Sequence, residues 1–179
     1  MASLPLVLSD DTCLNTTDIE KVFSIFRDDF ILNKIVLNID SVDYTVTVKE
    51  SLTCACPHGG VDKPERFWHI VSKKEYDTSK QNNPCQNMRE KQRVYCSARA
   101  KRIHWIKETI EGLFRKDEHI KYFSEDNGML THFLWDTKRF YIVLIKHLGK
   151  SDALLVTAYP VHKNKYRDYM SRLKKYEKK

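Results

Sequence analysis

Two apolar runs near the C-terminus constrain the fold more than any other feature of this chain. They are "RFYIVLIKHL" at 139–148 and "ALLVTAYPV" at 153–161, and only the polar "GKSD" separates them. Aromatic and β-branched residues dominate both runs, as is typical of strands. Two such runs joined by a short turn predict an antiparallel hairpin.

The rest of the chain predicts further helices and strands in an order that does not alternate. Helices are expected from "TTDIEKVFSIFRDDF" (16–30), "SARAKRIHWIKETIEGLF" (97–114) and the basic tail (164–179). Strands are expected from "KIVLNI" and "YTVTVK", joined by "DSVD", and from "ERFWHIV" (65–71), before some twenty weakly patterned residues. This order favours an α+β fold with a mostly antiparallel sheet packed against helices.

Charge divides the 179 residues unevenly. Residues 1–62 carry 4 basic and 10 acidic side chains, residues 63–115 carry 13 and 6, and residues 163–179 carry 8 and 2. We therefore expect an acidic N-terminal helix-hairpin extension (1–62) packed on a basic core with a basic C-terminal helix (63–179). The basic segments suit a polyanionic partner, or are a solvated surface. The acidic segment could fold over the basic face of its own chain or of another subunit.

Cysteine and hydropathy patterns suggest a reduced, cytoplasmic protein. Five cysteines are an odd number, which argues against a disulfide framework. "CACPH" offers Cys54, Cys56 and His58, which Cys85 or Cys96 could complete as a metal site, but C-x-C is not the usual ligand spacing. We expect unligated thiols, no cofactor, no signal peptide and no membrane span.

His69 is the first candidate site residue. On a strand over 65–71 it shares a face with Phe67 and Val71, which is the expected core face. A titratable imidazole there is either a buried histidine with a satisfied hydrogen bond or part of a site.

Arg99 and Arg102 are the second candidates. On a helix over 97–114, both point the same way as the apolar stripe that includes Ile103 and Ile106. Buried arginines are costly unless an anion meets them. Two guanidinium groups beside a helix N-terminus suit a phosphate, while an internal ion pair, with Glu65 or Asp77 for instance, is the alternative.

Thr157 and Tyr159 are the third candidates, and we expect them to share a strand face with Leu155. Metal-free RNA cleavage needs a base for the 2′-hydroxyl, cations for the charge on the phosphorane and an acid for the departing 5′-oxygen. One histidine, two arginines, a threonine and a tyrosine can supply these roles.

"FWHIV", "RAKRIHWIKETIE" and "RFYIVLIKH…LLVTAYPV" together resemble the phage-associated branch of the barnase–EndoU–colicin–RelE superfamily of nucleases. The resemblance covers roughly residues 65–162 and implies a nuclease core preceded by an α-β-β extension. It implies a metal-independent endoribonuclease, acting as a toxin or a phage or mobile-element effector on tRNA or mRNA, with an antitoxin or immunity protein as a further partner.

Carried onto this sequence, the resemblance implies that His69 is the general base, Arg99 and Arg102 bind the phosphate, and Thr157 and Tyr159 complete the catalytic set. We expect Lys73, Lys146, Lys163 and Lys165 to bind substrate. The competing interpretation is a basic RNA-binding or protein-interaction module without catalysis.

Overall fold

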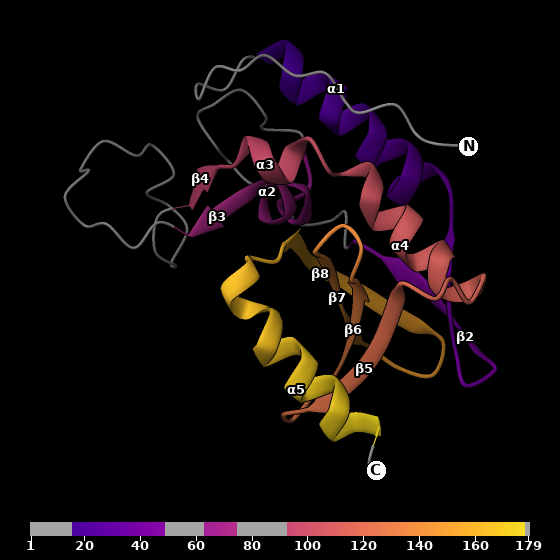
Figure 1. The fold of residues 1–179 in the computed structure, drawn as a ribbon. Coiled ribbons are helices and arrows are strands. Elements are labelled where there is room, and N and C mark those ends of the chain that lie inside the picture. The colour runs from indigo at the N-terminus through magenta and orange to yellow at the C-terminus, as the bar shows by residue number, and fades with distance from the viewer. Residues whose placement is uncertain (1–15, 49–62, 75–92, 178–179) are drawn as a thin grey trace.

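The computed structural model describes residues 16–48, 63–74 and 93–177 and has an α+β fold (Figure 1). Its main sheet is curled and has the strand order β1-β2-β8-β7-β6-β5. Only the β2–β8 pairing is parallel, so the expected mostly antiparallel sheet is confirmed for these residues. The strands are β1 (Ile35–Ile39), β2 (Val42–Thr47), β5 (Ile120–Asp126), β6 (Leu130–Asp136), β7 (Tyr141–His147) and β8 (Asp152–Pro160).

Helices cover both faces of the sheet (Figure 1). The larger core lies under α1 (Thr16–Arg27), its π-helical continuation η1 (Asp28–Leu32), α2 (Glu65–Val71), α3 (Ser97–Ala100) and α4 (His104–Phe114). The smaller core lies under α5 (Tyr166–Glu177), which the 3₁₀ turn η2 (Lys163–Lys165) precedes. We call the first side the α2 face and the second the α5 face.

The N-terminal segment contributes to the same sheet and core as the rest of the chain. Ile19, Val22 and Phe26 of α1 are fully buried in the larger core, and β2 joins the sheet beside β8. The expected β1–β2 hairpin is confirmed. Asp40 and Ser41 form its turn with φ values of 50° and 65°, the left-handed conformation that two-residue hairpins require.

The C-terminal hairpin and the tail helix are also confirmed. β7 and β8 pair antiparallel, and α5 buries Tyr169 and Leu173 against the smaller core. The helix expected over 97–114 is present in two parts, because residues 101–103 form a turn between α3 and α4. β5 and β6 were missed by the sequence prediction. Among the described helices, none is long and apolar enough to cross a membrane.

The strand predicted around His69 is wrong, because these residues form α2. Phe67, Trp68, Ile70 and Val71 are all buried, and their spacing suits one face of a short helix as well as a strand. Pro64 stands immediately before the helix, a position where a missing N–H costs nothing. The weakly patterned segment begins as β3 (Ser72–Lys74), which pairs with β4 (Arg93–Tyr95), and residues 75–92 lie outside the described residues.

Candidate functional site

Arg99 and Tyr159 form the centre of the candidate site. The guanidinium carbon of Arg99 lies 5.2 Å from the centroid of the Tyr159 ring. Its Nη1 donates a hydrogen bond of 2.7 Å to the carbonyl oxygen of Ser72, which follows α2. Burial lowers the pKa of Arg99, although nearby Cys96, Tyr141 and Tyr159 act in the opposite direction. The cation is therefore held in place at some cost in solvation.

The alternative of an internal ion pair is not realised among the described residues. Neither Arg99 nor Arg102 has a carboxylate partner there. Glu65, which the sequence offered as a partner, pairs instead with His69, and Asp77 lies outside the described residues. A half-buried guanidinium without a carboxylate partner is a favourable place for an anionic ligand.

Arg102 lies close to Arg99 but its guanidinium is directed differently. It donates to the carbonyl oxygen of Ala98 and stacks on Trp105, with 5.1 Å between its guanidinium carbon and the ring centroid. Burial raises the pKa of Tyr141, and the charges of both arginines oppose that effect. The charges of both arginines therefore reach the buried Tyr141. Because α3 is a single turn, the dipole of a long helix, which we expected to favour a phosphate beside the arginines, is absent at this position.

His69 is held by a carboxylate on its own helix. Its Nε2 lies 3.2 Å from Oε1 of Glu65, one turn earlier, and the His69 side chain is 22% exposed. His69 stands three residues before Ser72, whose carbonyl binds Arg99. Ser72 is the first residue of β3, so His69 and the Ser72 carbonyl that holds Arg99 lie on adjacent elements of the chain.

A β-bulge decides where Thr157 and Tyr159 point. Ile145 pairs with Leu155 but Leu144 pairs with Thr157, so one extra residue of β8 interrupts the register. Leu155 is buried in the larger core, whereas Tyr159 packs against the smaller one. The prediction that Leu155 shares a face with Thr157 and Tyr159 is therefore wrong. Thr157 and Tyr159 do lie together, on the α5 face.

The β2-side edge of β8 is paired along only its first part. β2 pairs with β8 only over Asp152–Leu154. Farther along, Nη1 of Arg66 donates a 3.1 Å hydrogen bond to the carbonyl oxygen of Val156. Burial lowers the pKa of Arg66. No sequence pattern indicated this third arginine, because its contact depends on α2 lying against the β8 edge.

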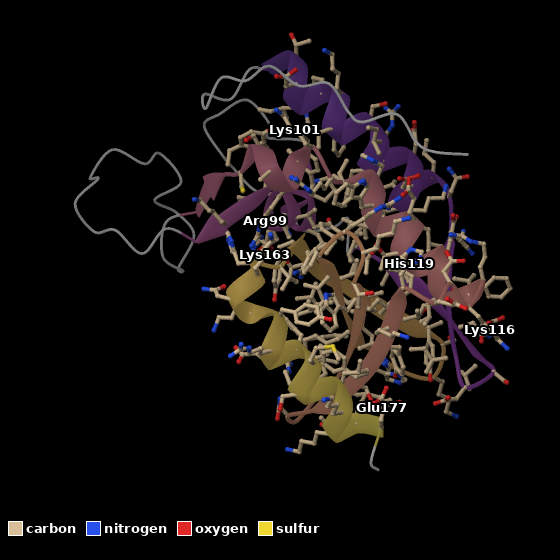
Figure 2. All side chains as sticks on the ribbon, in the orientation of Figure 1. Arg99, Lys101, Lys116, His119, Lys163 and Glu177 are labelled. Carbon is tan, nitrogen blue, oxygen red and sulfur yellow. The ribbon has the colours of Figure 1, made fainter. Side chains whose placement is uncertain are left out.

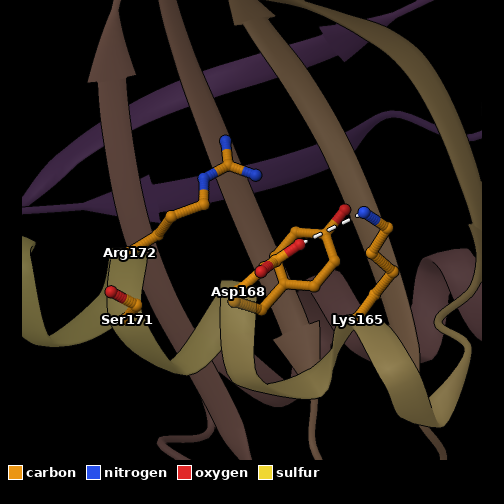
Figure 3. A pocket seen from close by; sticks show the side chains of 5 residues that line it. Lys165, Asp168, Ser171 and Arg172 are labelled. Carbon is orange, nitrogen blue, oxygen red and sulfur yellow. Dashed lines mark hydrogen bonds and ion pairs between the residues drawn. The ribbon is translucent and has the colours of Figure 1, made fainter.

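The hydroxyl groups of Tyr159 and Tyr169 are 2.9 Å apart and share a hydrogen bond. Tyr169 also lines a surface pocket of about 490 Å³ beside α5, together with Lys165, Asp168, Ser171 and Arg172 (Figure 3). Burial, and the bond to Tyr159, raise the pKa of Tyr169. The tyrosine pair therefore connects the Arg99 site to this pocket.

The four lysines expected to bind substrate lie in different parts of the molecule, and Lys146 is near the end of β7 that is farther from Arg99. Lys146 pairs across strands with Leu154, on the same sheet face as Thr157. Lys163 is exposed in η2, on the same side of the molecule as Arg99 in Figure 2. Lys165 pairs with Asp168 at 3.3 Å, and Lys73 is exposed on β3. Of the four, Lys163 is the one that Figure 2 places on the side of Arg99.

Within the described ranges, no three His, Cys, Asp or Glu side chains cluster as a metal site. Cys54, Cys56, His58 and Cys85 lie outside those ranges, and Cys96 is a free thiol at the end of β4. No family model, curated protein or solved structure matches the chain. The nuclease resemblance therefore remains a prediction from the residues quoted for it.

Proposed function

We propose that this protein is a metal-independent endoribonuclease that binds an RNA phosphate at Arg99. The observation that carries the proposal is the half-buried Arg99 guanidinium, which is fixed by Ser72 and Tyr159 and has no carboxylate partner among the described residues. A phosphate would offset the solvation that the guanidinium has lost, and guanidinium geometry suits phosphate oxygens. Arg102, whose charge also acts on Tyr141, supplies a second cation.

The chemistry assigned to the site is attack of the RNA 2′-oxygen on the adjacent phosphorus. His69 accepts the 2′-hydroxyl proton as the O2′–P bond forms. The Glu65 carboxylate beside Nε2 stabilises the positively charged ring that this transfer produces. Arg99 and Arg102 stabilise the phosphorane charge. The P–O5′ bond then breaks, and the leaving oxygen takes the Tyr159 hydroxyl proton while Tyr169 donates to Tyr159. The products carry a 2′,3′-cyclic phosphate and a 5′-hydroxyl.

RNA binding without cleavage is the second candidate, and one observation favours it. The Tyr159 hydroxyl is already bonded to Tyr169, and the Arg102 guanidinium is bonded to Ala98. In that case the same cations hold RNA, and His69 with Glu65 only stabilises α2.

The test is cleavage of total RNA in excess EDTA by the wild type, His69→Ala and Arg99→Ala. His119→Ala is the matched histidine control, because Figure 2 places His119 far from Arg99. Cleavage that leaves cyclic phosphate ends, persists in the control and disappears in both site variants is the expected result. RNA that is bound in a salt-dependent way but left intact would support the binding protein instead. Cleavage that survives both site substitutions would refute the assigned residues.

The proposed activity also predicts the biological setting. In keeping with the resemblance described above, we propose that it acts in the cytoplasm as a toxin or as a phage or mobile-element effector, restrained by an antitoxin or immunity protein. Induced expression of the wild type should arrest growth, whereas His69→Ala at equal protein level should not. Equal toxicity of the two would contradict a cleavage-based effect.

A further inference from the structure

The outer surface of α5 carries a row of basic side chains that the proposed cleavage chemistry does not use. Four exposed residues of this helix lie within about 100° of one another around its axis, at 100° per residue. They are Arg167, Ser171, Lys174 and Lys175, and we call them the α5 stripe. Lys163, which is also exposed, stands in the turn before the helix. One side of α5 is therefore basic and open to solvent.

The cations of this surface are not held in ion pairs within the protein. Lys165 pairs with Asp168, and Arg172 pairs with Glu125, so the charges of those two basic residues are compensated. Four other basic residues of the segment have no carboxylate partner in the part of the chain that the structure describes; they are Lys163, Arg167, Lys174 and Lys175. Unpaired cations in a row along one face suit a polyanion, because each can contact a phosphate.

The opposite side of α5 argues against a membrane as the anionic partner. Tyr169 and Leu173 are buried, because they pack in the smaller core. A basic helix that binds a bilayer needs its apolar side free to enter the lipid. Since α5 buries that side against the sheet, only its charged side is available to a partner. Nucleic acid, which is bound through its phosphates, fits such a surface better.

α5 begins next to the candidate site and leads away from it. Tyr169 shares a hydrogen bond of 2.9 Å with Tyr159, whose ring centroid lies 5.2 Å from the guanidinium carbon of Arg99. Figure 2 shows Lys163 on the side of Arg99 and Glu177 at the far end of α5. The 12 residues of the helix, at about 1.5 Å each, span roughly 18 Å. A strand bound along α5 therefore runs away from the bond that is cleaved.

We propose that the α5 stripe binds the RNA on the 3′ side of the cleaved bond. This inference rests on the proposed function, in which the departing 5′-oxygen takes its proton from Tyr159. That oxygen belongs to the nucleotide on the 3′ side of the cleaved phosphate. Because the Tyr159 hydroxyl is bonded to Tyr169 of α5, the 3′ nucleotide leaves the site on the side of α5. The phosphates that follow then lie along the basic side of the helix.

Two oligonucleotide substrates test both the surface and its direction. Each has a single ribonucleotide, of mixed base, in a strand of 2′-O-methyl nucleotides, so 2′-oxygen attack is restricted to one position. The first substrate carries about eight nucleotides on the 3′ side of that position and one on the 5′ side, and the second has the reverse arrangement. Cleavage of both is followed in EDTA at about 0.1 M KCl, with the full-length protein.

Arg167→Ala/Lys174→Ala is the decisive variant, because both side chains are exposed and lie outside the core. A phosphate contact to a single strand adds about 0.7 to the salt slope, which is roughly fivefold in affinity at 0.1 M salt. Two lost contacts should therefore raise the KM of the first substrate roughly 25-fold, with kcat and the KM of the second substrate nearly unchanged. Lys34→Ala/Lys150→Ala removes the same charge from other exposed positions and should change neither KM.

A folded Arg167→Ala/Lys174→Ala protein with the wild-type KM for the first substrate would overturn the proposal. A rise in KM confined to the second substrate would overturn the direction. Fluorescence anisotropy with a fully 2′-O-methyl strand measures binding without cleavage. Salt-dependent binding that the double substitution weakens, without cleavage by the wild type, would refute the nuclease and the direction but support RNA binding on α5. Binding to phosphatidylserine vesicles and not to RNA would overturn the RNA surface as well.

Discussion

Replacing Arg99 with methionine should separate RNA binding from folding. Methionine keeps a flexible stem of similar length and removes the charge. The protein loses the hydrogen bond to Ser72, worth about 1.5 kcal/mol at the lower end for a charged donor, and a stack on Tyr159 worth about 0.5–1 kcal/mol. The substitution also removes a buried charge, whose unfavourable desolvation is seen in the lowered pKa of the guanidinium, and this change favours the folded state. These effects oppose each other, so we expect the unfolding free energy to stay within about 1 kcal/mol of the wild type.

RNA affinity should fall far more. A charge-assisted phosphate contact contributes about 1.5–3 kcal/mol, so its loss should weaken binding roughly 10- to 100-fold. Each phosphate contact to a single strand adds about 0.7 to the slope of log K against log salt, so the slope should become shallower by about that amount. Fluorescence anisotropy with a 2′-O-methyl oligonucleotide, which cannot be cleaved by 2′-oxygen attack, measures both quantities over a series of KCl concentrations.

Lys34→Ala provides the control for simple charge removal, because Lys34 is exposed just before β1. It should leave the affinity within about twofold and the slope nearly unchanged. An Arg99→Met protein that is folded and keeps the wild-type slope would refute a phosphate contact at Arg99. A loss of more than about 3 kcal/mol of stability would show that the guanidinium is mainly a structural group.

Three further predictions concern the fold. Ser41→Gly should raise the unfolding free energy by about 0.5–1 kcal/mol, because Ser41 has a φ of 65° in the β1–β2 turn, whereas Ser41→Ala should not raise it; thermal melting compares them. Arg172→Ala should cost about 2 kcal/mol in urea denaturation, since two 2.6 Å contacts to Glu125 and three aromatic rings hold the guanidinium, while exposed Arg167→Ala should cost under about 0.5 kcal/mol. His132 has a folded pKa of about 4, below the unfolded value, so the unfolded chain binds more protons and stability should fall by up to roughly 3 kcal/mol as the pH drops from 7 to 4; a His132→Gln protein with the same pH profile would contradict this.

Elements with a strong local pattern could be predicted from the sequence. β7 and β8 carry long apolar runs around a short turn, and α5 carries Tyr169 and Leu173 at helical spacing. In both cases neighbouring residues in the chain determine the structure. The same holds for β1 and β2, because a two-residue turn between two strands determines an antiparallel hairpin.

Elements whose pattern is ambiguous or weak were predicted wrongly or missed. The seven residues of α2 alternate poorly and fit a strand or a helix, and only its packing against the larger core and the β8 edge decides between them. β5 lies at the edge of the sheet and has few fully buried positions, so its polar residues mask the strand pattern. The nearness of Arg99 to Tyr159 follows from contacts between distant segments, which no local pattern contains.

The bulge in β8 links these observations to the candidate site. In a regular strand Thr157 and Tyr159 would lie beside Leu155, facing the core under α2 and α4. The extra residue moves both to the α5 face, where Tyr159 meets the Tyr169 hydroxyl. It also bends the strand at the point where pairing with β2 has already ended, which leaves the edge open to Arg66. Because residues 153–156 are all apolar, the sequence pattern does not show which of them is the extra residue. The identity of the site residues could therefore be proposed from the sequence, but their arrangement depends on a register that only the three-dimensional structure reveals.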